Sequence, residues 1–408
     1  MELFETAVNA GGGAAITKEA NMRKRSLMRD VLLAAVVCAF FAACSKEQTI
    51  KIGFSIPLTG DSPKFGEGAK FSGELVKNAV NEAGGLDVKG KKYKLEFVYV
   101  DNELKPESAV QSGLRLIEQD KALAIVGPCG SGRAIPGGQV ANENRTPMVS
   151  PWATNPAVTL DRPYVFRACI LDPVQAPAAV KFVKNEFPSI GKAAILYNIE
   201  DDYSKGLAGY FRDSWEKAGG VITNFESFGQ KDQDFAVQLT RIINSGAELL
   251  YLPDYYNHVA LIVSQAKDLG WGDKPVLGSD SWGSADLWSL SKGLVKGYFF
   301  TTHYAAAGAV GSTKAFIDTY KAAYGYVPDD VAALTYDSIN IILEAIKIAG
   351  LSGDLSKDRD AIRDAIANMK DFPGITGTMS FDANGDPTKP AVVVRVNDAG
   401  EFEYVTSL

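Results

Sequence analysis

Short apolar runs alternate with amphipathic runs along most of this 408-residue chain. The runs at 50–56, 94–100 and 123–127 are rich in Ile, Val, Leu and Phe, which is typical of strands covered on both faces. Helix-like segments separate these runs. Because parallel strands must be joined by crossover connections, the alternation predicts an α/β fold with doubly wound parallel sheets.

The alternation begins a second time after the sequence LDPVQAP at 171–177. Two similarly built halves predict two lobes, with a ligand cleft where the strand ends of one lobe face those of the other. The composition, 46% hydrophobic and 22% charged, suits a globular chain long enough for two such lobes.

Two of the strand-like runs end in loops of small and hydroxylated residues, AIVGPCGSG at 124–132 and MVSPWATNP at 148–156. Backbone N–H groups at the start of a helix, together with hydroxyls, favour a bound anion such as a carboxylate or a phosphate. The alternative is that Ser131 only caps a helix and that the glycines only form the turn.

The second loop, in the form TPMVSPWATNPAVT, and the opening stretch IKIGFSIPLTGDSPKFGEGAKFSGELVKNAVNEAGG resemble the periplasmic leucine/isoleucine/valine-binding protein family. The resemblance runs from about Ile50 to about Val396. Members of this family are substrate-binding components of ABC transporters with the type I periplasmic binding fold. Their chain crosses between the two lobes three times.

The resemblance therefore implies a division of this chain. Lobe 1 would comprise 50–172 and 304–386, and lobe 2 would comprise 173–303 and 387–408. The crossings would fall near Asp172, His303 and Asp386. Three connecting segments would form a hinge that lets the cleft close over a ligand.

The resemblance also implies the polar part of a ligand site. Ser131 aligns with the family serine that meets the ligand carboxylate, and Ala153 and Thr154 align with a pair that contacts carboxylate and ammonium. Asp280 stands where the family commonly carries a carboxylate for the ammonium group. The alternative for Asp280 is a cap on the following helix.

Aromatic residues are expected to line the same cleft. Tyr203 and Tyr255 align with tyrosines that contact ligand from lobe 2, with Tyr256 as the alternative to Tyr255. Phe65 aligns with an aromatic residue of lobe 1, and Trp152 occupies a position where the family has a small residue.

Together with Trp282, these rings exceed what an aliphatic ligand requires, so an aromatic or cationic ligand is an alternative. Arg133 follows the serine loop and is expected to face solvent; the alternative is that it pairs with a second carboxylate.

The N-terminal residues 1–43 have the features of an export signal, with basic residues at 23–29 and an apolar run at 31–43 that is too short to span a membrane. The ending FAAC resembles a lipobox, which predicts lipidation of Cys44 and a tether at 44–49. Cleavage after Ser45 is the alternative. The expected location is periplasmic or otherwise extracytoplasmic, with a lipid anchor in a bacterial membrane.

The charge and the remaining motifs limit other functions. A net charge of −7 argues against nucleic acid as a partner. Cys129 and Cys169 are expected to be two buried thiols. The DANGD motif predicts a turn and not a calcium loop, since Pro387 stands where the loop would need glycine. No metal or cofactor is expected.

An enzyme is not expected either, because His258 and His303 are far apart in sequence and neither lies near a nucleophile motif. The resemblance therefore implies a monomeric binding protein that captures a branched-chain or related amino acid and delivers it to an ABC permease with its ATPase. Alternatives are the same fold binding amides, urea or aromatic acids, a sensory ligand-binding subunit, and, more remotely, a hydrolase.

Overall fold

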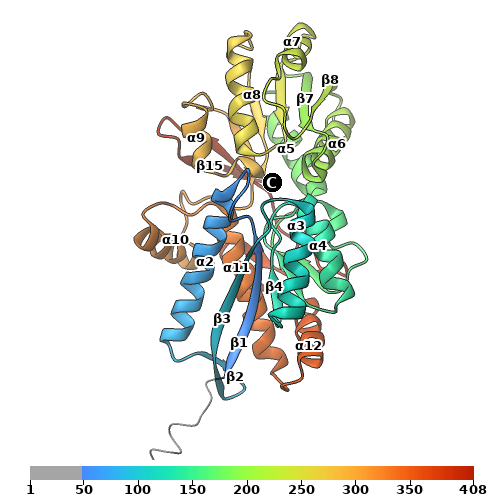
Figure 1. Ribbon diagram of the computed structural model, residues 1–408. Helices are drawn as coiled ribbons and strands as arrows, with labels where there is room; N and C mark the ends of the chain where they lie inside the picture. The colour runs from blue at the N-terminus through green and yellow to red at the C-terminus, as the bar shows by residue number, and fades with distance from the viewer. Residues whose placement is uncertain (1–47) are drawn as a thin grey trace, which may run out of the picture. The chain divides into compact units, whose positions relative to one another are not determined.

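The alternation of strands and helices predicted from the sequence is present in the structure, a computed structural model that describes residues 48–408 (Figure 1). The export signal, Cys44 and most of the tether lie outside the described residues. Among residues 48–408, no helix combines the length and the apolar character needed to cross a membrane.

Lobe 1 is built on a sheet whose described strands have the order β2-β3-β1-β4-β5-β6. The strands are β1 (Thr49–Ile56), β2 (Leu86–Val88), β3 (Lys91–Asp101), β4 (Ala124–Val126), β5 (Met148–Ser150) and β6 (Val165–Arg167). The helices of the N-terminal part of this lobe are α2 (Pro63–Glu82), α3 (Pro106–Leu114), which continues as a π-helical turn (Arg115–Gln119), and α4 (Ser131–Glu143).

Lobe 2 is built on a second sheet with the order β15-β14-β11-β10-β9-β7-β8. The strands are β7 (Lys192–Asn198), β8 (Val221–Phe228), β9 (Leu249–Leu252), β10 (Val276–Gly278), β11 (Phe299–Thr302), β14 (Val392–Val396) and β15 (Phe402–Ser407). Its helices are α5 (Asp172–Glu186), α6 (Asp202–Lys217), α7 (Ala236–Asn244), α8 (Tyr256–Asp268) and α9 (Asp286–Leu290).

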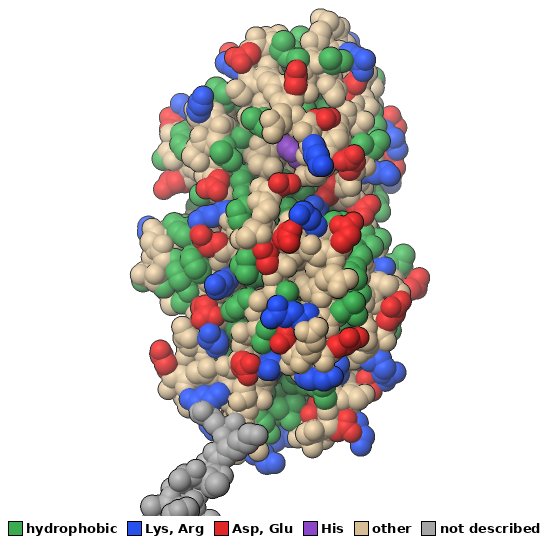
Figure 2. All heavy atoms as spheres, viewed as in Figure 1, with side chains coloured by type: hydrophobic (Ala, Val, Ile, Leu, Met, Phe, Trp, Pro, Cys, Tyr) green, Lys and Arg blue, Asp and Glu red, His purple; other side chains and the backbone are tan. Residues whose placement is uncertain are grey.

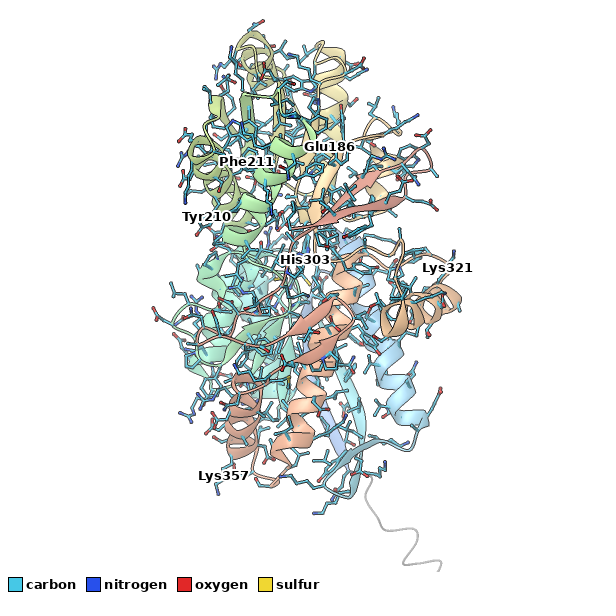
Figure 3. The ribbon with its side chains drawn as sticks, turned by 180° about the vertical axis from the view of Figure 1, so that it is seen from behind. Glu186, Tyr210, Phe211, His303, Lys321 and Lys357 are labelled. Carbon is cyan, nitrogen blue, oxygen red and sulfur yellow. The ribbon has the colours of Figure 1, made fainter. Side chains whose placement is uncertain are left out.

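The chain returns from lobe 2 to lobe 1 after β11 and goes back again before β14. The returning elements are α10 (Gly311–Tyr324), α11 (Asp330–Ala349), α12 (Leu355–Ala367) and the hairpin of β12 (Phe372–Gly374) and β13 (Gly377–Met379). They belong to lobe 1 because α11 packs on α2, where Ser72 Oγ donates to the Ala332 carbonyl at 2.7 Å. Figure 3 shows His303, just after β11, at the junction of the two lobes.

The doubly wound α/β class with two lobes is confirmed, with one correction to the strand directions. The strands β1, β3, β4, β5 and β6 pair in parallel, as do β7 to β11. However, β2 is antiparallel to β3, and β14 and β15 are antiparallel additions to the second sheet. Short hairpin connections join β2 to β3 and β14 to β15, whereas β14 pairs with β11 only after the chain has passed through lobe 1.

Two smaller predictions are also confirmed. Cys129 and Cys169 are buried free thiols. The DANGD segment is a turn, in which the Asp382 carboxylate accepts hydrogen bonds from the backbone N–H groups of Asn384 at 2.8 Å and Asp386 at 2.9 Å.

Candidate functional site

The serine loop connects β4 to α4 and is tied to the loop that follows β5. Gly130 precedes α4 with φ of 79°, a conformation that glycine adopts without strain. Its N–H donates to the Trp152 carbonyl at 2.8 Å, and the Asn155 N–H donates to Ser131 Oγ at 3.2 Å. The two loops that the sequence singled out therefore lie side by side, at the N-terminus of α4.

The second loop presents a hydroxyl that the protein leaves unused. The carbonyl of Ala153 accepts a hydrogen bond from Arg167, and that of Thr154 accepts one from the Asp172 N–H at 3.0 Å. Thr154 is 1% exposed, and its Oγ1 has no hydrogen-bond partner among the described residues. A buried hydroxyl without a partner is costly, so this atom is available to a ligand.

Asp280 lies on lobe 2, just after β10, inside a network of donors. Its Oδ1 accepts from Tyr203 Oη at 2.7 Å and Gln175 Nε2 at 2.8 Å, and its Oδ2 accepts from His303 Nε2 at 3.2 Å. The Asp280 side chain caps no helix, so the capping alternative is wrong. Ile170 donates its N–H to His303 Nδ1 at 3.4 Å, which places the imidazole proton on Nε2. Burial lowers the pKa of His303, so it acts here as a neutral donor.

Asp172 is a candidate site residue that the sequence analysis expected at a lobe crossing and did not assign to the ligand. Its side chain is fully buried, and neither carboxylate oxygen has a hydrogen-bond partner within residues 48–408. Burial raises its pKa to about 8; the Thr154 side chain opposes this rise and the charge of Asp280 adds to it. Its position directly before Pro173, at the start of a helix between the lobes, was the only sequence signal.

The predicted aromatic residues form one continuous cluster. In lobe 1, the ring centroids of Phe65 and Trp152 are 4.5 Å apart. Tyr255 from lobe 2 lies 5.9 Å from Trp152 and 5.6 Å from Tyr203. Tyr255 Oη has no partner in the described part of the chain, and a Cβ on Gly130 would come within 2.8 Å of it. This places the Tyr255 hydroxyl against the serine loop, whereas Tyr256 contacts Phe65 edge-on at 5.1 Å.

The expectation that Trp282 joins this cluster is wrong. Its indole packs so closely over Gly278 that a Cβ there would come within 2.2 Å of it. Its Nε1 donates to the Leu252 carbonyl at 3.0 Å, and its ring centroid lies 6.1 Å from that of Phe300. Trp282 is therefore part of the interior of lobe 2.

The expectation that Arg133 faces solvent is also wrong, because the residue is buried against a carboxylate of the protein itself. Its alternative, a pair with a second carboxylate on a ligand, stays a prediction. Arg133 is 6% exposed and forms an ion pair with Asp201. Asp201 also caps α6, accepting from the Tyr203 N–H at 2.9 Å. Since Arg133 belongs to lobe 1 and Asp201 to lobe 2, this buried pair joins the lobes across the cleft.

A cavity of about 630 Å³ lies between the lobes on the outer side of this ion pair. Its walls carry polar and charged side chains from both lobes, which include Asp61, Glu103, Lys105, Arg133, Glu200, Asp201, Asp202, Lys231, Asp232, Asn257 and His258. Acidic and basic side chains are interspersed over the face of the molecule shown in Figure 2. The Arg133–Asp201 pair thus separates the buried residues from this outer space.

The eight predicted site residues are each no more than 3% exposed and are drawn together from both lobes. Ser131, Ala153, Thr154, Phe65 and Trp152 come from lobe 1, and Tyr203, Tyr255 and Asp280 come from lobe 2. Their contacts with a ligand stay predictions. The arrangement offers hydroxyls and a helix N-terminus to an anion, and carboxylates to a cation, beside a wall of aromatic rings.

Known proteins are similar to this chain over nearly all of its described residues. Residues 49–401 match the family model described as "Periplasmic binding protein". "Leu/Ile/Val-binding protein homolog 3" of Brucella melitensis is 28% identical over 378 residues, which cover 92% of this chain and 98% of that protein. The "Leucine-, isoleucine-, valine-, threonine-, and alanine-binding protein" of Pseudomonas aeruginosa is 28% identical over 369 residues, 90% of this chain and 94% of that one.

Two solved structures have the same fold. A leucine-binding protein, LivK, from Thermotoga maritima superposes with a TM-score of 0.81 at 31% identity, covering 88% of this chain and 99% of that one. The branched-chain amino acid transporter substrate-binding protein LivJ from Streptococcus pneumoniae, solved in complex with isoleucine, gives a TM-score of 0.80 at 31% identity. That match covers 88% of this chain and all of the other.

Proposed function

The chain belongs to the periplasmic binding protein family, and from this premise we propose that it captures a branched-chain or related amino acid between its two lobes for an ABC transporter. The relatives named for leucine, isoleucine and valine support this ligand class. They do not favour amides, urea or aromatic acids as ligands, or a sensory role.

The observation that carries the proposal is the buried, unpartnered carboxylate of Asp172 in the same cleft as Asp280. A buried carboxylate without a partner is unfavourable unless a cation joins it. The α-ammonium group of an amino acid supplies both a positive charge and three N–H donors. In the proposed complex this group lies between Asp172 and Asp280.

The α-carboxylate of the ligand would lie at the serine loop. Ser131 begins α4, where the partial positive charge of the helix N-terminus favours an anion. Thr154 Oγ1 and Tyr255 Oη are buried hydroxyls that lack a partner in residues 48–408, and both lie beside this loop. The ligand side chain would then contact the rings of Phe65, Trp152 and Tyr203.

The lobes of this structure already contact each other through the Arg133–Asp201 pair. An amino acid that touches both lobes stabilises such a closed arrangement by its differential affinity for it. A permease distinguishes the closed from the open form, and its ATPase supplies the energy of transport. We place the hinge at the crossings near Asp172, His303 and Asp386, with lobe 1 at 50–172 and 304–386 and lobe 2 at 173–303 and 387–408.

Membership of the family implies an extracytoplasmic location. We propose in addition that the export signal at 1–43 is removed, that Cys44 carries the lipid anchor, and that the protein acts as a monomer. Mass spectrometry of the N-terminal peptide from a bacterial membrane fraction tests the anchor, and a Cys44→Ser variant should be released in soluble form.

Isothermal titration calorimetry of the purified protein against all standard amino acids, simple amides, urea and aromatic acids tests the ligand class. We expect saturable binding of leucine, isoleucine or valine and a higher melting temperature in their presence. Binding confined to ligands that lack an α-amino group would contradict the assignment. A protein that binds none of these compounds in its folded state would also contradict it.

A further inference from the structure

A second interlobe cavity lies on the hinge side of the molecule. Its volume is about 430 Å³, and its walls come from β11, β14 and the turn into β15 in lobe 2 and from the segment between β11 and α11 in lobe 1. This volume is within the range of small-molecule sites, which is roughly 300–1,000 Å³. None of the residues assigned above to the amino acid lines it.

The walls of this hinge cavity combine apolar and acidic side chains. The larger apolar residues are Phe300, Tyr304, Ile317, Val327, Val394 and Phe402. The charged residues are Asp329, Asp330, Glu401 and Glu403, and none of the described lining residues is Lys, Arg or His. Glu403 pairs with Arg395 outside the lining, so the unpaired charge comes from the other three. An apolar space with only negative charges in its walls is complementary to an organic cation and repels an organic anion.

Asp330 is an acidic residue of this lining whose buried carboxylate has one oxygen without a hydrogen-bond partner among the described residues. It is 2% exposed, and its Oδ2 accepts a hydrogen bond from Thr302 Oγ1 at 3.1 Å. Its Oδ1 has no hydrogen-bond partner within residues 48–408 and lies beside Gly283, which also lines the cavity, whereas its Oδ2 also lies 4.0 Å from His303 Nε2. Burial raises the pKa of Asp330, and the charge of Asp329 adds to that rise. A positive group placed here would stabilise the ionised carboxylate.

We propose that the hinge cavity is a second binding site, for a small primary amine with an apolar body, whose ammonium group is held by Asp330. The aromatic and aliphatic walls contact the body of the ligand, and the carboxylate fixes its charged end. The cavity shares no lining residue with those assigned to the amino acid, although Asp330 itself adjoins His303 and Trp152 of that cleft. The proposal does not depend on the function proposed for the cleft.

Because both lobes form its walls, occupation of the hinge cavity is coupled to the arrangement of the lobes. A ligand that fits the cavity in this closed arrangement stabilises it, and an amino acid in the cleft stabilises the same arrangement. The coupling is therefore positive and reciprocal, with each ligand increasing the affinity for the other by the same factor.

Calorimetry with 2-phenylethylamine, and with phenylacetate as an anion of similar size, tests the site on the full protein. The amine is expected to bind with one-to-one stoichiometry and phenylacetate is not. Saturation with leucine should increase the amine affinity, by the same factor by which the amine increases the affinity for leucine. Displacement of the amine by leucine, or equal binding of phenylacetate, would overturn the proposal.

Two variants locate the amine. Asp330→Asn removes the charge and should weaken amine binding at least about tenfold, as expected for a lost charge-assisted contact. Ala306→Trp fills the cavity from a half-buried position in its wall and should abolish amine binding while leaving the leucine affinity within about twofold. Amine binding that survives in both variants would show that it occurs elsewhere. A folded protein that binds the amine but not leucine would refute the proposed function and leave this site standing.

Discussion

Asp280 on lobe 2 and Asp172 at the first crossing are buried carboxylates of the same cleft, but they differ in their hydrogen-bond partners. Asp280 accepts hydrogen bonds from Tyr203, Gln175 and His303. Asp172 has no hydrogen-bond partner in the described chain. Lobe 2 therefore holds its carboxylate in one position, whereas Asp172 and the neighbouring Thr154 hydroxyl gain hydrogen-bond partners from the ligand in the proposed complex.

The largest effect should come from Asp280→Asn. The amide keeps the shape but loses the charge, and its NH₂ group faces donors from Tyr203, Gln175 or His303. We expect leucine affinity to fall at least about 100-fold, since removing one partner of a buried charged contact costs about 2–5 kcal/mol. We also expect a lower melting temperature of the ligand-free protein. Calorimetry and thermal unfolding measure both effects.

The exposed Asp398, paired with Lys296 at the surface, gives the matched control for this variant. Asp398→Asn should change neither the affinity nor the melting temperature, because exposed ion pairs contribute little. Equal behaviour of the Asp280 and Asp398 variants would remove Asp280 from the site.

Asp172→Asn should give the contrasting result. Affinity for leucine should fall by roughly tenfold or more, because the ammonium loses a charged acceptor. The ligand-free protein, however, should be as stable as before or more stable at pH 8, because an unpartnered buried charge has been removed. Chemical denaturation without ligand separates this outcome from that of Asp280→Asn, and a loss of stability in both variants would end the contrast between the two carboxylates.

The pH dependence of Asp172 provides a second measurement on the same pair of proteins. The folded-state pKa of about 8 lies above the ordinary value of 3.8, so the folded protein keeps a proton that the unfolded chain has lost. The corresponding contribution to the free energy of unfolding is complete below the ordinary pKa and is lost as the pH rises through about 8. Asp172→Asn should flatten this part of the stability profile; an unchanged profile would contradict the assignment.

Gly130→Ala tests the contact between the lobes and should have a smaller effect. The substitution places a Cβ at φ of 79° and within 2.8 Å of Tyr255 Oη. We expect leucine affinity to fall by about tenfold, because Tyr255 must move for the lobes to close. Calorimetry of Gly130→Ala, of Tyr255→Phe and of the double variant checks the cause, because Tyr255→Phe removes both the obstructing oxygen and a proposed ligand contact. The effect of Gly130→Ala should be smaller in the Tyr255→Phe background than in the native protein.

Gly219→Ala is the control for the backbone alone, because Gly219 has φ of 77° and no neighbour within 4 Å of the new Cβ. It should lower stability by about 1 kcal/mol and leave affinity unchanged. An affinity loss in Gly130→Ala that Tyr255→Phe does not relieve would show that the strain lies in the serine loop itself.

The smallest effect is expected from Thr154→Val. The valine keeps the shape and removes a hydroxyl that has no partner in the described protein, so the affinity should fall only a few-fold while the ligand-free stability rises or stays constant. Thr159→Val is the opposite case, because Thr159 Oγ1 donates to Asp386 at 2.8 Å and accepts from Arg167 at 2.7 Å. Its stability should fall, and equal stabilities in the two variants would contradict the distinction.

The residues that the sequence analysis placed well are those whose position follows from the ends of strands. Ser131 and Thr154 lie at the ends of neighbouring parallel strands, and Asp280 follows β10 in the other lobe. The end of a strand and the side-chain type are local properties, and a short motif reports both of them. The family resemblance added the roles.

The errors concern relations that a linear pattern does not contain. A charged helix residue such as Arg133 is typically exposed, and only the approach of Asp201 from the other lobe explains its burial. Trp282 packs on Gly278 because that residue has no side chain. Nothing in the linear sequence indicates that both carboxylate oxygens of Asp172 are buried without a hydrogen-bond partner among the described residues.

The Arg133–Asp201 pair also bears on how long a captured molecule is retained. Each time the lobes separate, a guanidinium and a carboxylate that are almost fully buried must part and regain water before the outer cavity connects with the aromatic cluster. This step adds to the barrier for opening and not to the contacts of the ligand itself. We therefore expect removal of the ion pair to increase the release rate of very different ligands by a similar factor. The residence time of a ligand would then depend on this ion pair, and the selectivity would depend on the residues of the cleft behind it.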